Sequence, residues 1–255
     1  MITSCKGGVG KSTVAANLGH TLALMGKRVL LIDLDLGMRC LDLILGLEDR
    51  ALYDVSDVVG GVPVERAVIA HPSCERLHFI AAPYTTERTV DADAFKAAVG
   101  EIRDSGAYDY IVVDTPGDIG YPFTLACSVA DAALIVASHG PTTIRAAEHT
   151  ARQLEDKGVT NMRLIINNYD TGDYRGISRG ERAGIIDIID RTYLRLLGVI
   201  PCDAAFARAQ EHGQLAGVKV SRNVATAFSN IARRIDGEQV SLFKGFKKIS
   251  RKKLM

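Results

Sequence analysis

The chain has 255 residues, 47% of them hydrophobic, and its 31 basic and 30 acidic side chains leave a net charge of +1. A chain of this length can bury one sizeable core. It contains no run of about 18 apolar residues, the length needed to cross a membrane. Five scattered cysteines without a C-x-x-C pair exclude a zinc ribbon or bridging iron–sulfur site, and with no secretory signal they indicate reduced thiols in a cytosol.

Short apolar runs alternate with helical patterns along the chain, which predicts an α/β fold. We expect one P-loop domain over residues 1–236, a mostly parallel twisted sheet with helices on both faces, and a separate tail over 237–255. The expected strands are Met1–Ser4, Arg28–Asp33, Leu77–Ala81, Tyr108–Asp114, Ala132–Ala137 and Met162–Asn167. The expected helices are Ser12–Met25, one around Tyr53–Val59, Asp91–Ser105, Pro141–Asp156, one within 170–192, and Ser221–Ile235.

The segment Cys5–Thr13, C-K-G-G-V-G-K-S-T, lies between the first strand and the first helix. Its glycines let backbone N–H groups point at one spot, which the positive end of the helix dipole also faces. Lys11 and Ser12 at this spacing specify a triphosphate with Mg²⁺, because the lysine reaches the β- and γ-phosphates and the serine hydroxyl is a metal ligand. The predicted nucleotide-binding residues here are Lys6, Gly7, Gly8, Val9, Gly10, Lys11, Ser12 and Thr13.

Two departures from the general P-loop pattern G-x-x-x-x-G-K-[ST] refine this prediction. Cys5 stands where that pattern has glycine, and Lys6 adds a lysine inside the loop. K-G-G-V-G-K-S-T closely resembles the deviant Walker A motif of the MinD/ParA family of ATPases. The resemblance implies hydrolysis of ATP to ADP and phosphate, with Lys6 crossing a dimer interface to the partner's nucleotide and with Lys6, Lys11 and Asp35 as catalytic residues.

Acidic residues follow two of the buried strands. D-L-D-L-G-M-R-C-L-D begins at Asp33, and Asp114 ends the apolar run Y-D-Y-I-V-V-D. Carboxylates at strand ends near a phosphate site can bind Mg²⁺ through water or orient an attacking water. The first stretch resembles the family's switch I region, which makes Asp35 the water-positioning residue and gives Asp33 a role supporting the metal. Asp114 fits the Walker B role of holding Mg²⁺.

The stretch D-T-P-G-D-I-G departs from the D-x-P-A-G of MinD-like proteins. Gly117 can still offer its amide to the γ-phosphate. Asp118 adds a carboxylate that either repels that phosphate, points away or assists the metal. The hydrolysis rate therefore stays open, and a non-catalytic nucleotide switch remains an alternative.

Two later segments resemble the family's adenine-binding loops. The strand M-R-L-I-I-N ends at Asn167, whose side-chain amide would contact adenine, although Asn168 replaces the arginine that often follows in the family. G-V-I-P, ending at Pro201, resembles the second adenine-side loop. Ordinary strand ends explain both segments about equally well.

The C-terminal tail carries a second pattern. Residues 241–255 contain six basic and no acidic side chains, which leaves 25 basic and 30 acidic residues in the rest of the chain. On a helical wheel, apolar side chains lie opposite most of the lysines, which is typical of a segment that lies on an anionic membrane. The predicted membrane-binding residues are Leu242, Phe243, Lys244, Phe246, Lys247, Lys248, Ile249, Arg251 and Lys252.

The resemblance implies an ATP-dependent homodimer, which would present two tails and bind the cytoplasmic face of the cell membrane reversibly and peripherally. The family resemblance adds spatial regulation of the division site, with a septation inhibitor and an ATPase-activating partner. A ParA-type partition ATPase that binds DNA and a flagellar-number regulator are the alternatives. The apolar residues between the tail's lysines favour a membrane over DNA, because phosphate contact needs no apolar stripe.

Overall fold

The computed structural model describes residues 1–85, 90–171, 183–217 and 219–246. Within these residues the strands form one sheet in the order β3-β4-β2-β5-β1-β6-β7-β8, parallel except for the β3–β4 pair. The strands are β1 (Ile2–Thr3), β2 (Val29–Asp33), β3 (Ile69–His71), β4 (Cys74–Ile80), β5 (Tyr110–Asp114), β6 (Ala133–Ala137), β7 (Met162–Tyr169) and β8 (Leu196–Pro201). This arrangement confirms the predicted α/β architecture.

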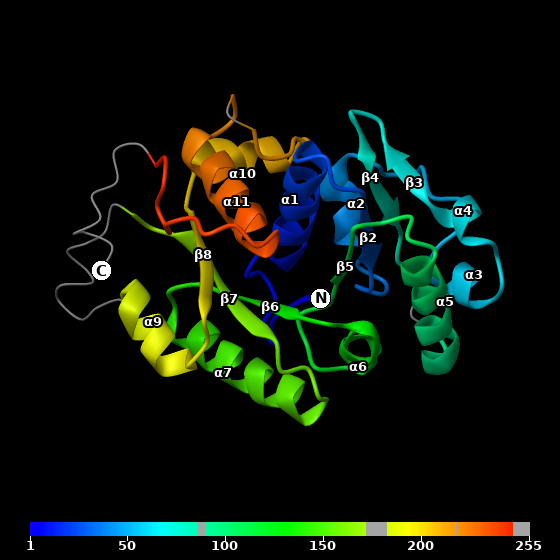
Figure 1. The fold of residues 1–255 in the computed structure, drawn as a ribbon, viewed down its shortest axis with the longest axis horizontal. Coiled ribbons are helices and arrows are strands. Elements are labelled where there is room, and N and C mark those ends of the chain that lie inside the picture. The colour runs from blue at the N-terminus through cyan, green and yellow to red at the C-terminus, as the bar shows by residue number, and fades with distance from the viewer. Residues whose placement is uncertain (86–89, 172–182, 218, 247–255) are drawn as a thin grey trace.

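Helices cover both faces of the sheet (Figure 1). They are α1 (Lys11–Leu24), α2 (Cys40–Leu45), α3 (Val55–Val59), α4 (Val64–Ala67), α5 (Ala92–Asp104), α6 (Tyr121–Val129), α7 (Pro141–Asp156), α9 (Ile185–Thr192), α10 (Ala204–Gln210) and α11 (Arg222–Ile235). On one face α1, α2 and α11 share a core with strand side chains. On the other, α7 and α9 pack in a second cluster and α3 and α5 in a third, while α6 contributes to both of these.

Local chemistry explains where the main elements begin and end. All five residues of β2 are buried, as expected for a central strand covered by helices on both faces. Helix α1 ends at Leu24, and Gly26 follows its C-cap with a φ of +90° that suits glycine, while α7 begins at Pro141, a residue favoured in a first turn. Because every strand but β3 runs in the same direction, the loops that follow them meet at one edge of the sheet.

Several expectations needed correction. The chain also forms α2, α4, α6, α10 and β3, which the sequence patterns did not indicate. For Gly198–Pro201 the structure has the strand end that was the alternative to a loop: these are the last four residues of β8, which pairs in parallel with β7. The first strand covers only Ile2–Thr3, shorter than expected. Most of the loop expected within 170–192 lies outside the described residues.

Candidate active site

The P-loop joins the central strand β1 to α1. Gly8 and Gly10 adopt φ values of +75° and +89°, the left-handed region that glycine tolerates best. Gly10 caps the N-terminus of α1 and accepts a hydrogen bond of 2.9 Å from the Val14 amide, so the helix axis starts at the loop. This is the curved backbone at a helix N-terminus that binds phosphate.

Lys11, the first residue of α1, is only 7% exposed, and its Nζ donates to the Lys6 carbonyl at 3.4 Å. Burial lowers the pKa of Lys11, and the negative charges of Asp114, Asp35 and Asp118 oppose that shift. The structure therefore brings the P-loop lysine together with one acid each from β5, the loop after β2, and the loop after β5. A polyphosphate bound here would contact the Lys11 ammonium, which already lies near three carboxylates.

Asp33 and Asp114 are paired neighbours at the ends of the adjacent strands β2 and β5. Asp33 Oδ1 accepts from the Asp35 amide at 2.8 Å, and Oδ2 accepts from the Leu41 amide at 3.4 Å. Burial, followed by the charge of Asp114, raises the pKa of Asp33 well above its ordinary value. Both oxygens of Asp33 therefore bind backbone N–H groups of the segment 35–41, which begins with Asp35.

Asp114 is fully buried, and among the described residues neither of its carboxylate oxygens accepts a hydrogen bond of good geometry. Burial raises its pKa to about 7, while the nearby Ser12 hydroxyl and the Lys11 ammonium oppose that rise. Buried carboxylate oxygens close to a serine hydroxyl and a phosphate loop suit Mg²⁺, which takes one or two protein oxygens and completes its shell with phosphates and water. In the same described ranges, no group of three or more His, Cys, Asp or Glu side chains forms a metal site without a nucleotide.

The loop after β5 approaches the P-loop through Gly117. A Cβ at this position would lie 2.7 Å from the Gly7 amide nitrogen and 2.8 Å from the Gly7 Cα, closer than real Cβ atoms approach backbone. Only glycine therefore fits, which agrees with the predicted role for its amide near the γ-phosphate. The neighbouring Asp118 is exposed, and its charge raises the pKa of the half-buried Asp35, whose largest cause of elevation is burial.

Helix α7 holds the opposite side of the P-loop. The Thr150 hydroxyl accepts from the Cys5 amide at 2.9 Å and lies 2.8 Å from Cys5 Sγ, while Lys6 Nζ donates to Thr142 Oγ1 at 2.5 Å. Neither threonine was predicted to contact the P-loop. The pattern of an amphipathic helix does not show which of its threonines will contact a loop 136 or 145 residues away in the sequence.

The predicted adenine side lies at the ends of β7 and β8. Asn167 is 9% exposed, and its Nδ2 donates to the Val9 carbonyl of the P-loop at 2.9 Å. Pro201 ends β8 and pairs with Tyr169 of β7. The structure thus places Asn167 against the phosphate loop, while Pro201 lies at the same edge of the sheet.

The described part of the tail packs against the body of the protein. Phe243 is 9% exposed and belongs to the core cluster of α7 and α9, and its ring meets Phe246 edge to face at 5.6 Å between centroids. Asn230 of α11 donates to the Lys244 carbonyl at 2.8 Å, and Leu242 also packs against that cluster. The other predicted membrane residues, Lys247, Lys248, Ile249, Arg251 and Lys252, lie outside the described residues.

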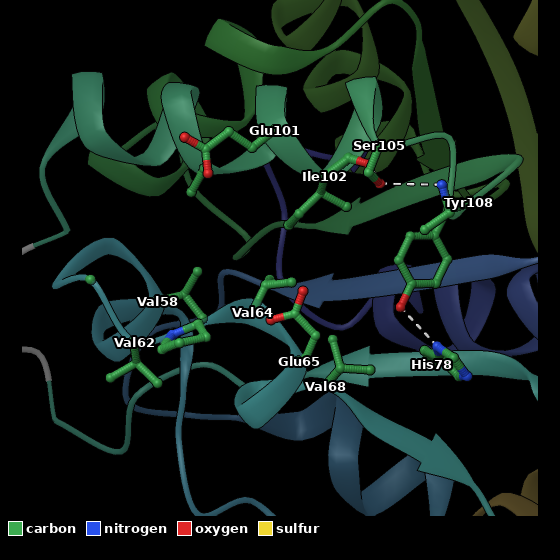
Figure 2. Close-up of a pocket in the computed structure, with 14 residues that line it drawn as sticks. Val58, Val62, Val64, Glu65, Val68, His78, Glu101, Ile102, Ser105 and Tyr108 are labelled. Atoms are coloured by element: carbon green, nitrogen blue, oxygen red, sulfur yellow. Dashed lines mark hydrogen bonds between the residues drawn. The ribbon is translucent and has the colours of Figure 1, made fainter.

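A separate cavity of about 630 Å³ lies between α3–α4 and α5 (Figure 2). Valine side chains form much of its wall, Glu65 and Glu101 lie at its rim, and His78 Nδ1 lies 2.7 Å from the Tyr108 hydroxyl. None of its lining residues belongs to the P-loop or to the acids around Lys11. In the part of the chain that the structure describes, no helix is long and apolar enough to cross a membrane.

Comparison with known proteins agrees with this geometry. Residues 1–216 match the model of the CobQ/CobB/MinD/ParA nucleotide binding domain. The chain is 35% identical over 246 residues to the septum site-determining protein MinD of Bacillus subtilis, covering 95% of this chain and 90% of that one. It superposes with a TM-score of 0.87 and 37% identity on a chain of the MinC:MinD cell division protein complex of Aquifex aeolicus, covering 94% and 96% of the two chains. Septum site-determining protein MinD of Pyrococcus horikoshii, solved with Mg-ADP, matches with a TM-score of 0.80 and 27% identity over 92% and 94% of the two chains.

Proposed function

The chain belongs to the MinD/ParA family of P-loop ATPases, and from that premise we propose that it hydrolyses ATP to ADP and phosphate and regulates where the cell divides. One observation carries the proposal: a buried P-loop lysine lies among Asp35, Asp114 and Asp118 at the end of a glycine-rich anion loop. The Mg-ADP held by the Pyrococcus relative supports the same choice of ligand.

Each residue has a distinct task in this proposal. The P-loop amides and Lys11 bind the β- and γ-phosphates and stabilise the charge that develops as the terminal bond breaks. Asp35, whose backbone amide donates to Asp33 Oδ1, orients the attacking water. Ser12 and Asp114 would hold Mg²⁺, which neutralises charge on the phosphate oxygens. Gly117 leaves its amide free to approach the γ-phosphate.

Lys6 acts across a dimer interface. Its Nζ rests on Thr142 of its own subunit, an exposed contact that can be exchanged for a partner's phosphate at little cost. In the proposed dimer, two such subunits meet with their nucleotides between them, next to the P-loop of each. We expect Lys6→Gln to bind ATP as a monomer and to form no ATP-dependent dimer in light scattering.

The nucleotide assignment is tested by Lys11→Ala. We expect its affinity for Mg-ATP to fall by more than about 100-fold, because the buried ammonium makes charge-assisted bonds to the phosphates. Lys27→Ala is the matched control, since Lys27 follows the far end of α1 and pairs with Asp236. Calorimetry should find Lys27→Ala unchanged, and tight ATP binding by Lys11→Ala would contradict the assignment.

The tail is proposed to bind an anionic membrane. Residues 247–255 carry five basic side chains, each contributing roughly 1 kcal/mol near such a surface, and two tails on one dimer gain roughly 10²-fold through effective concentration. ATP binding would therefore recruit the protein to the cytoplasmic face of the membrane, and hydrolysis would release it.

Sedimentation with anionic vesicles tests this cycle. A variant ending at Phe246 keeps the packed segment Val240–Phe246 and removes only the basic end. We expect the full chain to pellet with ATP and not with ADP, and the shortened chain not to pellet. Pelleting that ignores nucleotide, or that survives the truncation, would contradict the membrane cycle.

Partners follow from the same comparison. The Aquifex structure joins MinD with MinC, and we propose a MinC-like septation inhibitor as effector here, together with a partner that stimulates hydrolysis. A ParA-type protein would instead bind DNA in a salt-sensitive way without needing the apolar residues of the tail. DNA binding by the chain, with no vesicle binding, would replace the division function by partition.

A further inference from the structure

Asn167 connects the end of β7 to the P-loop through one buried hydrogen bond. Its Nδ2 donates to the Val9 carbonyl at 2.9 Å. A Cβ built on the neighbouring Gly10 would lie 2.3 Å from that same nitrogen, so the amide fills the space beside the left-handed turn of the loop. The reversed amide orientation would set its oxygen against the Val9 carbonyl oxygen and is excluded by repulsion.

The backbone at the end of β7 positions this amide. The pairing of β7 with β8 shifts register between Ile166 and Tyr169, and Asn168 adopts a φ of +52°. Asn167 and Tyr169 on either side of it are both buried, while Asn168 is exposed. A bulge at this position re-aims the side chain before it, as bulges beside active sites do.

We propose that Asn167 is a positioning residue for the phosphate loop: it holds Val9 and Gly10 in the curvature that binds the phosphates. The inference rests on the proposed nucleotide function and extends it. An amide carries two N–H groups and one oxygen, so the bond to Val9 leaves groups that can also meet adenine. Asn167 then links the base side of the site to its phosphate side, and both contribute to one binding event.

The experiment compares ATP with inorganic tripolyphosphate, which has phosphates and no base, both in the presence of Mg²⁺. Asn167→Leu keeps the branched shape of the side chain and removes the donor. We expect the affinity for tripolyphosphate to fall by about tenfold, the worth of one hydrogen bond to a loop that bears charge, and the affinity for ATP to fall by at least that factor. Asn168→Gly, next in sequence and exposed, is the control and should change neither affinity, because glycine keeps the φ of +52° without strain.

The ratio of the two affinities decides the outcome. A loss for ATP with unchanged tripolyphosphate binding would overturn the proposal and leave Asn167 as a reader of adenine alone, and no loss for either ligand would overturn it as well. If leucine prevents folding, Asn167→Ala introduces no bulk beside Gly10 and gives the same ratio. Wild-type protein that binds neither ligand would instead overturn the nucleotide function itself.

Discussion

The P-loop and the C-terminal tail 237–255 were both predicted from sequence to be functional segments, and the structure places their described residues in different surroundings. The P-loop lies where its motif predicted, between a central strand and a helix, with Lys11 among acids. Phe243, predicted to enter a membrane, is instead buried in a protein core, and Arg234 donates to the Val240 carbonyl at 2.9 Å. The P-loop motif predicted the local structure around Lys11. The apolar stripe of the tail did not show whether its side chains lie against protein or against a membrane.

The physical reason is that a bilayer and a protein core reward the same side chains. Removing apolar area from water is favourable in either place, so a helical wheel cannot say which one receives Phe243. The basic side chains do discriminate, because only a polyanion rewards a cluster of them. The membrane proposal accordingly depends most on residues 247–255, which hold five of the six basic residues of the tail.

Gly117→Ala tests the P-loop side of this comparison and has the largest expected effect. The added methyl would lie 2.7 Å from the Gly7 amide nitrogen, so one of the two loops must move and the Gly117 amide leaves the γ-phosphate position. We expect ATP turnover to fall by about 10³-fold, as when a positioned donor is lost from a reacting group. Steady-state phosphate release measures the change.

Gly100→Ala provides the control for that experiment. Gly100 lies within α5, and a Cβ there meets nothing within 4 Å. Alanine should leave turnover unchanged and raise the free energy of unfolding by about 0.5–1 kcal/mol, because glycine weakens a helix interior. Equal ATP turnover in the two variants would contradict the assignment of Gly117 to the γ-phosphate site.

Phe243→Ala tests the tail side. The ring is buried beside Phe246 and the core of α7 and α9, so its loss should lower the free energy of unfolding by about 3 kcal/mol. Vesicle pelleting by the folded variant should persist, since the basic end is intact. Lys244→Ala, exposed in the same segment, should leave stability within about 0.5 kcal/mol. If the variant no longer pellets with vesicles and its free energy of unfolding is unchanged, Phe243 binds the membrane and does not stabilise the core.

The same distinction explains how much of the fold could be predicted. Long apolar runs such as β2 and β5 were found because buried parallel strands are continuously apolar. Helix α6 was missed because its start follows the D-T-P-G-D-I-G turn, and β3 because three residues give no measurable period. The contacts of Thr142 and Asn167 with the P-loop depend on tertiary packing, which no local pattern encodes.

Asp114→Asn tests how much the buried carboxylate of Asp114 lowers the stability of the nucleotide-free protein. With its pKa raised to about 7, folded Asp114 keeps its proton where the unfolded chain, with a pKa near 4, has lost it. Asp114 should therefore make the nucleotide-free protein less stable as the pH rises from about 4 to about 7, and the buried Asp33, whose pKa is also raised, adds a loss of the same sign. The asparagine variant lacks the loss due to Asp114, so at pH 8 we expect its Tm to exceed the wild type by about 5 °C. An equal difference at pH 5 and pH 8 would contradict this account.

Thr142→Val carries the smallest expected effect and tests how freely Lys6 can leave its own subunit. Lys6 Nζ donates to Thr142 Oγ1 in an exposed contact, and a bond of this kind contributes at most about 1 kcal/mol. Valine keeps the shape of threonine and removes the acceptor, so the lysine need not break that bond before it reaches a partner's nucleotide. ATP-dependent dimers should form at up to about fivefold lower protein concentration in light scattering, with unchanged affinity for ATP in the monomer. Weaker dimers would show that Thr142 contributes to the interface itself, because removing a contact that only retains Lys6 cannot disfavour its transfer.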